Sequence, residues 1–153
     1  MQPTVSVALC THNGAAFLEQ QLKSIALQSR LPDECIISDD HSEDETIAIA
    51  KRFQDSVSFP VRIFQNTQAI GVAGNFDLAT SKSTSEFIFL CDQDDIWLPD
   101  RIARTLEVFA QDAELTLLHA NADLIDHKDQ MLGLTLFEAL ELSVKERILE
   151  DTG

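Results

Sequence analysis

The chain has 153 residues, enough to bury the core of one ordinary domain, and its hydrophobic fraction of 44% excludes disorder as the default state. A formal net charge of −15 makes nucleic acid and anionic membranes unfavourable partners. Apolar stretches fall short of the roughly 20 residues that cross a membrane, and the N-terminus lacks the pattern of a secretion signal. We therefore expect one domain over residues 1–153, in the cytoplasm or at the cytoplasmic face of a membrane, with its three cysteines reduced.

In the first half of the chain, short apolar runs alternate with amphipathic stretches. Strands are predicted at Val5–Cys10, Glu34–Ser38 and Val61–Phe64. Asn13-Gly14 opens the first helix, and Ser42 with Glu45 has the spacing of a capping box for the second. The apolar positions that recur at helical spacing in the first helix are Phe17, Leu18, Leu22 and Ile25, and the second helix carries Ile47, Ile49 and Phe53.

The second half continues the alternation before it changes character. A short helix is predicted from Asn75 to Ser81, strands at Glu86–Cys91 and Leu115–Leu118, and between these strands a helix after Pro99. Two further short strands, Asp123–Asp126 and Met131–Leu134, flank a polar turn, and an amphipathic helix is predicted over Leu136–Leu149. Strands that alternate with helices predict an α/β fold: a mainly parallel sheet with helices on both faces.

Polar side chains follow each of the first four predicted strands. Parallel sheets bind ligands at the carboxyl ends of their strands, so these residues are expected to meet at one edge. They are Thr11-His12-Asn13, Asp39-Asp40, Asn66 and Asp92–Asp95. The acidic cluster Asp92–Asp95 has two interpretations, a solvated turn that caps the helix after Pro99 or a site for a hard cation. Polar residues also follow the other three strands, which favours the cation site.

A nucleotide held at this edge would need a cation, because the chain has no glycine-rich phosphate loop. Asp92 and Asp94 are placed to hold Mg²⁺ or Mn²⁺ between the protein and two phosphate oxygens. Asp40 is a candidate acceptor for the ring N–H of a pyrimidine base, and Thr11 for a contact to base or ribose. Asp39 is more simply explained as a partner of the helix that follows Ser42.

These segments, in this order and spacing, resemble the family 2 glycosyltransferases, which have the GT-A fold. The matching pieces are Val5–Asn13, Asp39–Thr46, Asn66 with Gly71 and Asn75-Phe76, and Asp92-Gln93-Asp94-Asp95-Ile96-Trp97. The resemblance implies transfer of a sugar, with inversion, from a nucleotide diphosphate donor to a saccharide or lipid-linked saccharide. The last segment resembles rhamnosyltransferases of bacterial surface polysaccharides, which implies a UDP-sugar or dTDP-rhamnose.

The resemblance also assigns residues. It implies that Thr11, Asn13, Asp40, Asp92 and Gln93 bind the nucleotide, and that Asp92 and Asp94 form the Asp-x-Asp metal motif, with Asp94 the nearest match to the metal ligand.

Family members continue past this point with an acceptor-binding part that supplies the catalytic base, so the catalytic residues are left unassigned. Glu150-Asp151 only superficially resembles the base motif. A module that binds nucleotide sugars without turnover, or a truncated inactive relative, is the alternative. A phospho-receiver domain and a glycoside hydrolase fit the spacing of the acids and of Lys128 less well.

Overall fold

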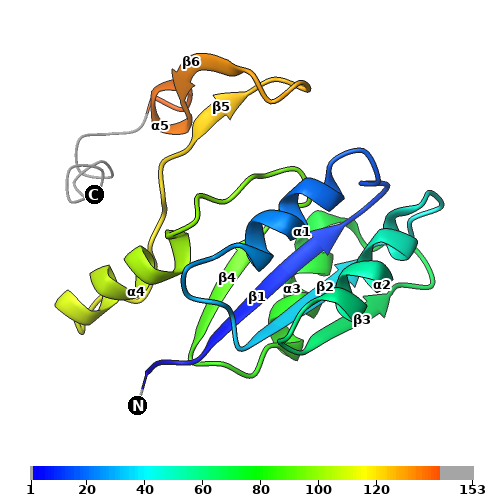
Figure 1. Ribbon diagram of the computed structural model, residues 1–153, viewed down its shortest axis with the longest axis horizontal. Coiled ribbons are helices and arrows are strands. Elements are labelled where there is room, and N and C mark those ends of the chain that lie inside the picture. The colour runs from blue at the N-terminus through cyan, green and yellow to red at the C-terminus, as the bar shows by residue number, and fades with distance from the viewer. Residues whose placement is uncertain (1, 142–153) are drawn as a thin grey trace. The chain divides into compact units, whose positions relative to one another are not determined.

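A computed structural model describes residues 2–141, and the chain divides into two compact units, Met1–Leu106 and Glu107–Gly153 (Figure 1). The first unit contains a sheet of four strands in the order β3-β2-β1-β4. Every neighbouring pair in this sheet is parallel. The strands are β1 (Val5–Thr11), β2 (Glu34–Asp39), β3 (Val61–Gln65) and β4 (Phe87–Cys91).

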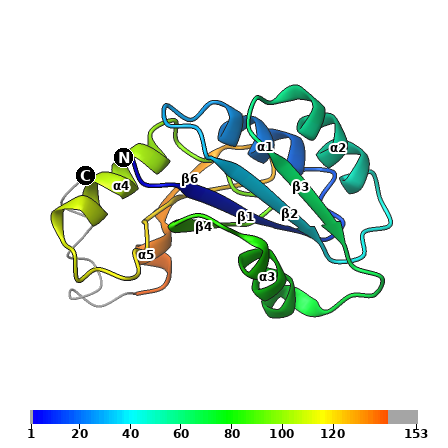
Figure 2. The same cartoon turned by 90° about the horizontal axis from the view of Figure 1, so that it is seen from below.

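Helices cover both faces of this sheet, as Figure 2 shows. On one face, alternate strand residues such as Val7, Leu9 and Ile37 pack with α1 (Leu18–Ala26) and α2 (Thr46–Ser56). On the other face, Ala8 and Ile36 pack with α3 (Gly71–Lys82). The predicted α/β architecture, with a parallel sheet between helices, is therefore confirmed.

Most of the apolar positions predicted for these helices face the sheet, but Phe17 precedes α1 and is 43% exposed, and Ile47 is only half-buried. Leu18, Leu22 and Ile25 are buried on α1, and Ile49 and Phe53 are buried on α2, so each helix presents one apolar stripe to the sheet. The three cysteines, Cys10, Cys35 and Cys91, are buried free thiols, as predicted.

The remaining elements follow β4 along the chain. Helix α4 (Arg101–Gln111) begins shortly after Pro99, as predicted. In the second unit, β5 (Asp123–Ile125) and β6 (Met131–Thr135) form an antiparallel hairpin, and α5 (Leu136–Ala139) follows with a capping box between Thr135 and Glu138. No helix between residues 2 and 141 has the length and apolar character needed to cross a membrane.

Some predictions about individual elements need correction or fall outside the description, and the predicted start of the short helix at Asn75 is also wrong, because α3 begins at Gly71. Leu115–Leu118 does not form a strand; this run is open chain that pairs with no strand of the described residues, and Leu117 is 65% exposed. The box between Ser42 and Glu45 is absent because α2 begins only at Thr46 and its N-terminal residue makes no side-chain cap. Of the predicted helix Leu136–Leu149, the part from 142 onward lies outside the described residues, as does Glu150-Asp151.

Candidate functional site

The four strand ends meet at one edge of the sheet, as the sequence predicts. The strand pairing continues into the loops, because the backbone N–H of Asp40 donates to Thr11 O at 2.7 Å and that of Asn66 donates to Asp39 O at 2.9 Å. Burial first, and then the negative charges of Asp92 and Asp40, raise the pKa of Cys10 to about 12. The two carboxylates therefore lie within electrostatic reach of one thiol near the end of β1.

Thr11 and Asp39 form a buried hydrogen-bonded pair at this edge. The Thr11 hydroxyl donates to Asp39 Oδ1 at 2.8 Å, and the backbone N–H of Ser42 donates to Asp39 Oδ2 at 2.9 Å. Asp39 is fully buried and Thr11 is 2% exposed. Asp39 therefore contacts Ser42 as expected, but it holds the loop before α2 and not the helix itself. The Thr11 side chain is engaged inside the protein.

Asp40 joins the loop between β3 and α3 to the end of β2. Its Oδ1 accepts from Ile70 N at 2.7 Å and from Asn66 Nδ2 at 3.0 Å, and its Oδ2 accepts from Gly71 N at 2.8 Å. Burial opposes ionisation of Asp40, but these hydrogen bonds outweigh it and lower the pKa of the carboxyl. A carboxylate oxygen accepts two bonds, so Oδ2 keeps capacity for one more donor.

Asn13 and His12 form the exposed part of the loop after β1. Asn13 has a φ of 48°, its N–H donates to Ser42 Oγ at 2.8 Å, and its Oδ1 accepts from Glu43 N at 2.9 Å. His12 Nδ1 lies 2.7 Å from Asp40 O. These contacts fix the loops after β1 and β2 against each other at the surface.

The acidic loop, which we define as Asp92–Trp97, carries three exposed carboxylates, those of Asp92, Asp94 and Asp95. Partial burial and the charge of Asp94 raise the pKa of Asp92. The pKa of Asp95 is raised by partial burial and by both neighbouring carboxylates, against an opposing effect of Arg101. The cluster is therefore short of positive charge.

Gln93 lies between these acids in the sequence, but its side-chain amide forms hydrogen bonds with the backbone of His12, in the loop that follows β1. Gln93 Oε1 accepts from His12 N at 2.8 Å, and Gln93 Nε2 donates to His12 O at 3.1 Å. The resemblance placed Gln93 at the nucleotide; the structure places its amide on His12.

Sequence reasoning missed a second set of supports on α1 and its C-terminal end. Ser24 Oγ accepts from Trp97 N at 3.1 Å, and the Gln28 amide donates to Leu98 O at 2.7 Å and accepts from Ile102 N at 3.1 Å. In the orientation that satisfies both of its polar atoms, the Gln21 amide donates to Asp95 O and accepts from Trp97 Nε1. The available signal was the spacing of 21, 24 and 28, which puts all three on one face of a helix.

The oxygen ligands at this edge fit a divalent cation that is bound partly by the protein and partly by a phosphate. Within residues 2–141, no three His, Cys, Asp or Glu side chains converge as a complete protein cage for a metal ion. Mg²⁺ in nucleotide sites is commonly bound by one or two carboxylates, with waters and phosphate oxygens completing its shell. Asp92 and Asp94 supply that number of exposed carboxylates on one short loop.

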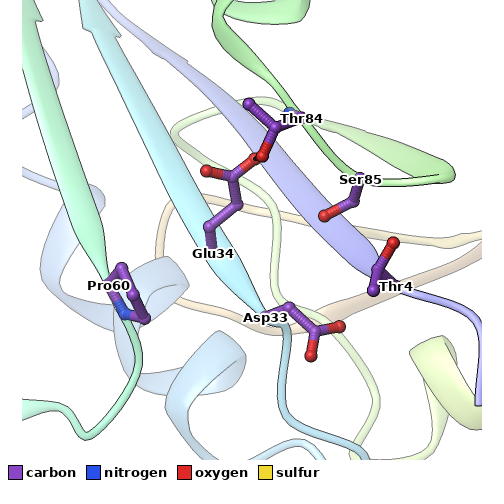
Figure 3. A pocket seen from close by; sticks show the side chains of 6 residues that line it. All are labelled: Thr4, Asp33, Glu34, Pro60, Thr84 and Ser85. Atoms are coloured by element: carbon purple, nitrogen blue, oxygen red, sulfur yellow. Dashed lines mark hydrogen bonds between the residues drawn. The ribbon is translucent and has the colours of Figure 1, made fainter.

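A separate hollow of about 320 Å³ lies at the amino edge of the sheet and is lined by Thr4, Asp33, Glu34, Pro60, Thr84 and Ser85 (Figure 3). Glu34 is its central charge. Glu34 Oε1 accepts from Ser6 Oγ at 2.6 Å and from Thr84 N at 2.7 Å, and Oε2 pairs with Arg62 at 2.7 Å. Because hydrogen bonds and an ion pair already satisfy the Glu34 carboxylate, we interpret this hollow as a structural feature and not as a ligand site.

Comparison with known proteins agrees with this geometry. The family model described as Glycosyl transferase family 2 matches residues 6–133. The dTDP-rhamnosyl transferase RfbG of Shigella flexneri is 34% identical over 103 residues, covering 65% of this chain and 36% of that protein. An uncharacterized glycosyltransferase of Nostoc sp., alr2836, is 28% identical over 140 residues, covering 91% of this chain and 42% of its own.

Among solved structures, the mannosyltransferase PcManGT from Pyrobaculum calidifontis, in complex with GDP-Man and Mn²⁺, has a TM-score of 0.67 and 25% identity. The alignment covers 72% of this chain and 33% of that one. The chain thus spans less than half the length of the curated relatives named above. The match over residues 6–133 covers most of the sequence, and the chain belongs to glycosyl transferase family 2.

Proposed function

We propose that the carboxyl edge of this sheet is the donor site of a nucleotide-sugar transferase and holds the diphosphate of the donor through a divalent cation. The observation that carries the proposal is the acidic loop: exposed, mutually repelling carboxylates at the end of β4, on the same edge as Asp40. A cation bound by Asp92 and Asp94 would relieve this repulsion. When bound, such an ion stabilises the negative charge that grows on a diphosphate leaving group.

The proposal gives the remaining edge residues different tasks. Asp40 keeps one acceptor position on Oδ2 and is the candidate for the ring N–H of the base. Asn13 is exposed on the loop after β1. Thr11 is assigned a supporting task, because its hydroxyl already donates to the buried Asp39.

We propose UDP or dTDP as the nucleotide, since a single acceptor for a ring N–H suits a pyrimidine, and the rhamnosyl transferase of Shigella flexneri is named for a dTDP-sugar. PcManGT was solved with GDP-Man, so GDP belongs in the test. Inverting transfer to a saccharide or lipid-linked saccharide, in the cytoplasm and for a bacterial surface polysaccharide, is the corresponding proposal for the whole protein.

The test is calorimetry with UDP, dTDP and GDP, each with Mn²⁺ or Mg²⁺ and each with EDTA. We expect one of the pyrimidine nucleotides to bind, and to bind at least about tenfold more weakly in EDTA, a difference of about 1.4 kcal/mol. Equal affinity in EDTA would remove the cation from the proposal. Preference for GDP would refute the pyrimidine assignment. Release of free sugar from the donor would separate an enzyme from a module that only binds.

A further inference from the structure

Gln93 supports the acidic loop through a pair of hydrogen bonds that imitates strand pairing. The regular pairing of β1 with β4 ends at Leu9 and Cys91. Two residues later, the Gln93 side chain accepts from His12 N and donates to His12 O, at 2.8 and 3.1 Å. An amide side chain has the same donor and acceptor as a peptide group, so it extends the ladder where the backbone of the acidic loop leaves it. We call this pair of bonds the Gln93 clasp.

The clasp requires a glycine at position 14. A Cβ on Gly14 would lie 2.5 Å from Gln93 Cδ and closer still to its Oε1. Gly14 cannot move away easily, because its N–H donates to Thr46 Oγ1 at 2.8 Å and its carbonyl accepts from Phe17 N and Leu18 N at 3.0 Å. The reason for glycine here is therefore steric.

The other end of the acidic loop is held independently. Ser24 accepts from Trp97 N. In the amide orientation that satisfies both of its polar atoms, Gln21 donates to Asp95 O and accepts from Trp97 Nε1. The guanidinium of Arg101 lies 4.6 Å from the centre of the Trp97 ring, and Trp97 is 3% exposed. Anchored points at 93 and at 95–97 thus bracket Asp94, while the side chains of Asp92, Asp94 and Asp95 are exposed.

On an unsupported loop, the carboxylates of Asp92 and Asp94 would move apart, which lowers their repulsion but disrupts a preformed cation site. The hydrogen bonds at 93 and at 95–97 restrict that movement. We propose that Gln93 is a positioning residue: its clasp on His12, permitted by Gly14, holds Asp92 and Asp94 close enough together to bind a cation with a nucleotide diphosphate. This inference rests on the proposed function of the carboxyl edge and assigns to Gln93 a task other than contact with the nucleotide.

The first test measures UDP affinity of the wild-type chain and of Gln93→Ala, with Mn²⁺ and with EDTA. Trp97 is the single tryptophan and the chain has no tyrosine, so its emission reports on the acidic loop directly. We expect Gln93→Ala to weaken UDP binding about tenfold in Mn²⁺, the usual effect of losing a support behind a metal ligand, and to leave binding in EDTA unchanged. Gln20→Ala, on the exposed face of α1, is the matched control and should bind like wild type.

The second test is a double-mutant cycle on thermal stability without nucleotide or metal. In the wild-type background, Gly14→Ala should lower Tm by about 4 °C or more, because it forces overlap with the Gln93 amide. In the Gln93→Ala background the same change should have little effect, since the overlapping atoms are gone. Gly74→Ala, whose new Cβ would meet Ile70 at 3.4 Å, is the glycine control and should be insensitive to Gln93.

The outcomes separate the inference from the proposed function. Equal weakening of UDP binding in Mn²⁺ and in EDTA would make Gln93 a nucleotide contact and overturn the positioning role. Unchanged binding by Gln93→Ala, or additive effects of the two substitutions on Tm, would also overturn it. If the wild-type chain binds UDP equally well with Mn²⁺ and with EDTA, the proposed function itself is refuted. This measurement on the wild-type chain therefore precedes those on the variants.

Discussion

The two edges of the parallel sheet treat negative charge in opposite ways. At the amino edge, Glu34 is 8% exposed and its carboxylate is surrounded by donors from Ser6, Thr84 and Arg62. At the carboxyl edge, Asp92, Asp94 and Asp95 are exposed and repel one another. Burial opposes ionisation of Glu34, yet its hydrogen bonds prevail and lower its pKa to about 2, whereas the pKa of Asp92 is raised.

This difference distinguishes a charge that stabilises the fold from charges left for a ligand. Donors that surround a carboxylate in the folded state lower its pKa and contribute to the free energy of unfolding. Carboxylates that repel one another reduce that free energy until a cation joins them. The three predictions below test this contrast, from the largest expected effect to the smallest.

Glu34→Gln should lower the free energy of unfolding by up to about 3.5 kcal/mol at pH 7, because one pKa unit corresponds to about 1.4 kcal/mol. The pKa of Glu34 falls from 4.5 to about 2 on folding. Its stabilising effect is therefore complete above pH 4.5 and is lost as the pH falls toward 2. Urea unfolding of both chains at several pH values should show a difference that disappears in acid.

Glu19→Gln, at an exposed position of α1, is the control for this experiment and should change stability by no more than about 0.5 kcal/mol. A difference between wild type and Glu34→Gln that persists unchanged at pH 2 would show that packing, not charge, explains the role of Glu34.

Asp94→Asn should weaken ligand binding without lowering stability, the reverse of Glu34→Gln. Loss of a charged ligand should weaken Mn²⁺-dependent nucleotide binding at least about tenfold, or 1.4 kcal/mol. The free energy of unfolding without ligand should hold or rise, because the charge that raises the pKa of Asp92 and Asp95 is removed. Calorimetry and urea unfolding measure the two effects, with Asp77→Asn on the exposed side of α3 as control. Marked destabilisation would instead give Asp94 a structural role.

Mn²⁺ alone should have the smallest effect. At a free Mn²⁺ concentration equal to its Kd, the free energy of unfolding should rise by about 0.4 kcal/mol, as mass action requires. The same addition should not change the stability of Asp94→Asn. Equal stabilisation of both chains would place the cation elsewhere.

The elements of the sheet were predictable because their apolar runs are short, regular and separated by helical spacing. Val5–Cys10 and Glu34–Ser38 lie within a residue of β1 and β2. Leu115–Leu118 failed because an apolar run alone does not supply a neighbouring strand. Helix α3 begins at Gly71 and not at Asn75, since Asp40 accepts from Ile70 N and Gly71 N at its first turn. That contact joins residues 30 and 31 positions apart and leaves no local signal.

The carboxylates of the candidate site were also predictable, because charged residues directly after apolar strands have few structural explanations. Their supports were not. Gln21, Ser24 and Gln28 carried no signal of this role, because a polar residue on a helix is ordinary at the surface. Only the fold reveals that these three side chains are buried against the acidic loop and the segment that follows it.

The position of β4 in the sheet also has a consequence for the order of folding. β1 pairs with β2 across 28 residues, as between Ser6 and Glu34, but its pairing with β4 spans 82 residues, as between Ser6 and Ile88. By loop-closure entropy, joining β4 costs about 1 kcal/mol more than joining β2. We therefore expect β3, β2 and β1 to associate first and β4 to dock late, slowed by its high contact order. The acidic loop that follows β4 then reaches the loop after β1 only once the other three strands have assembled.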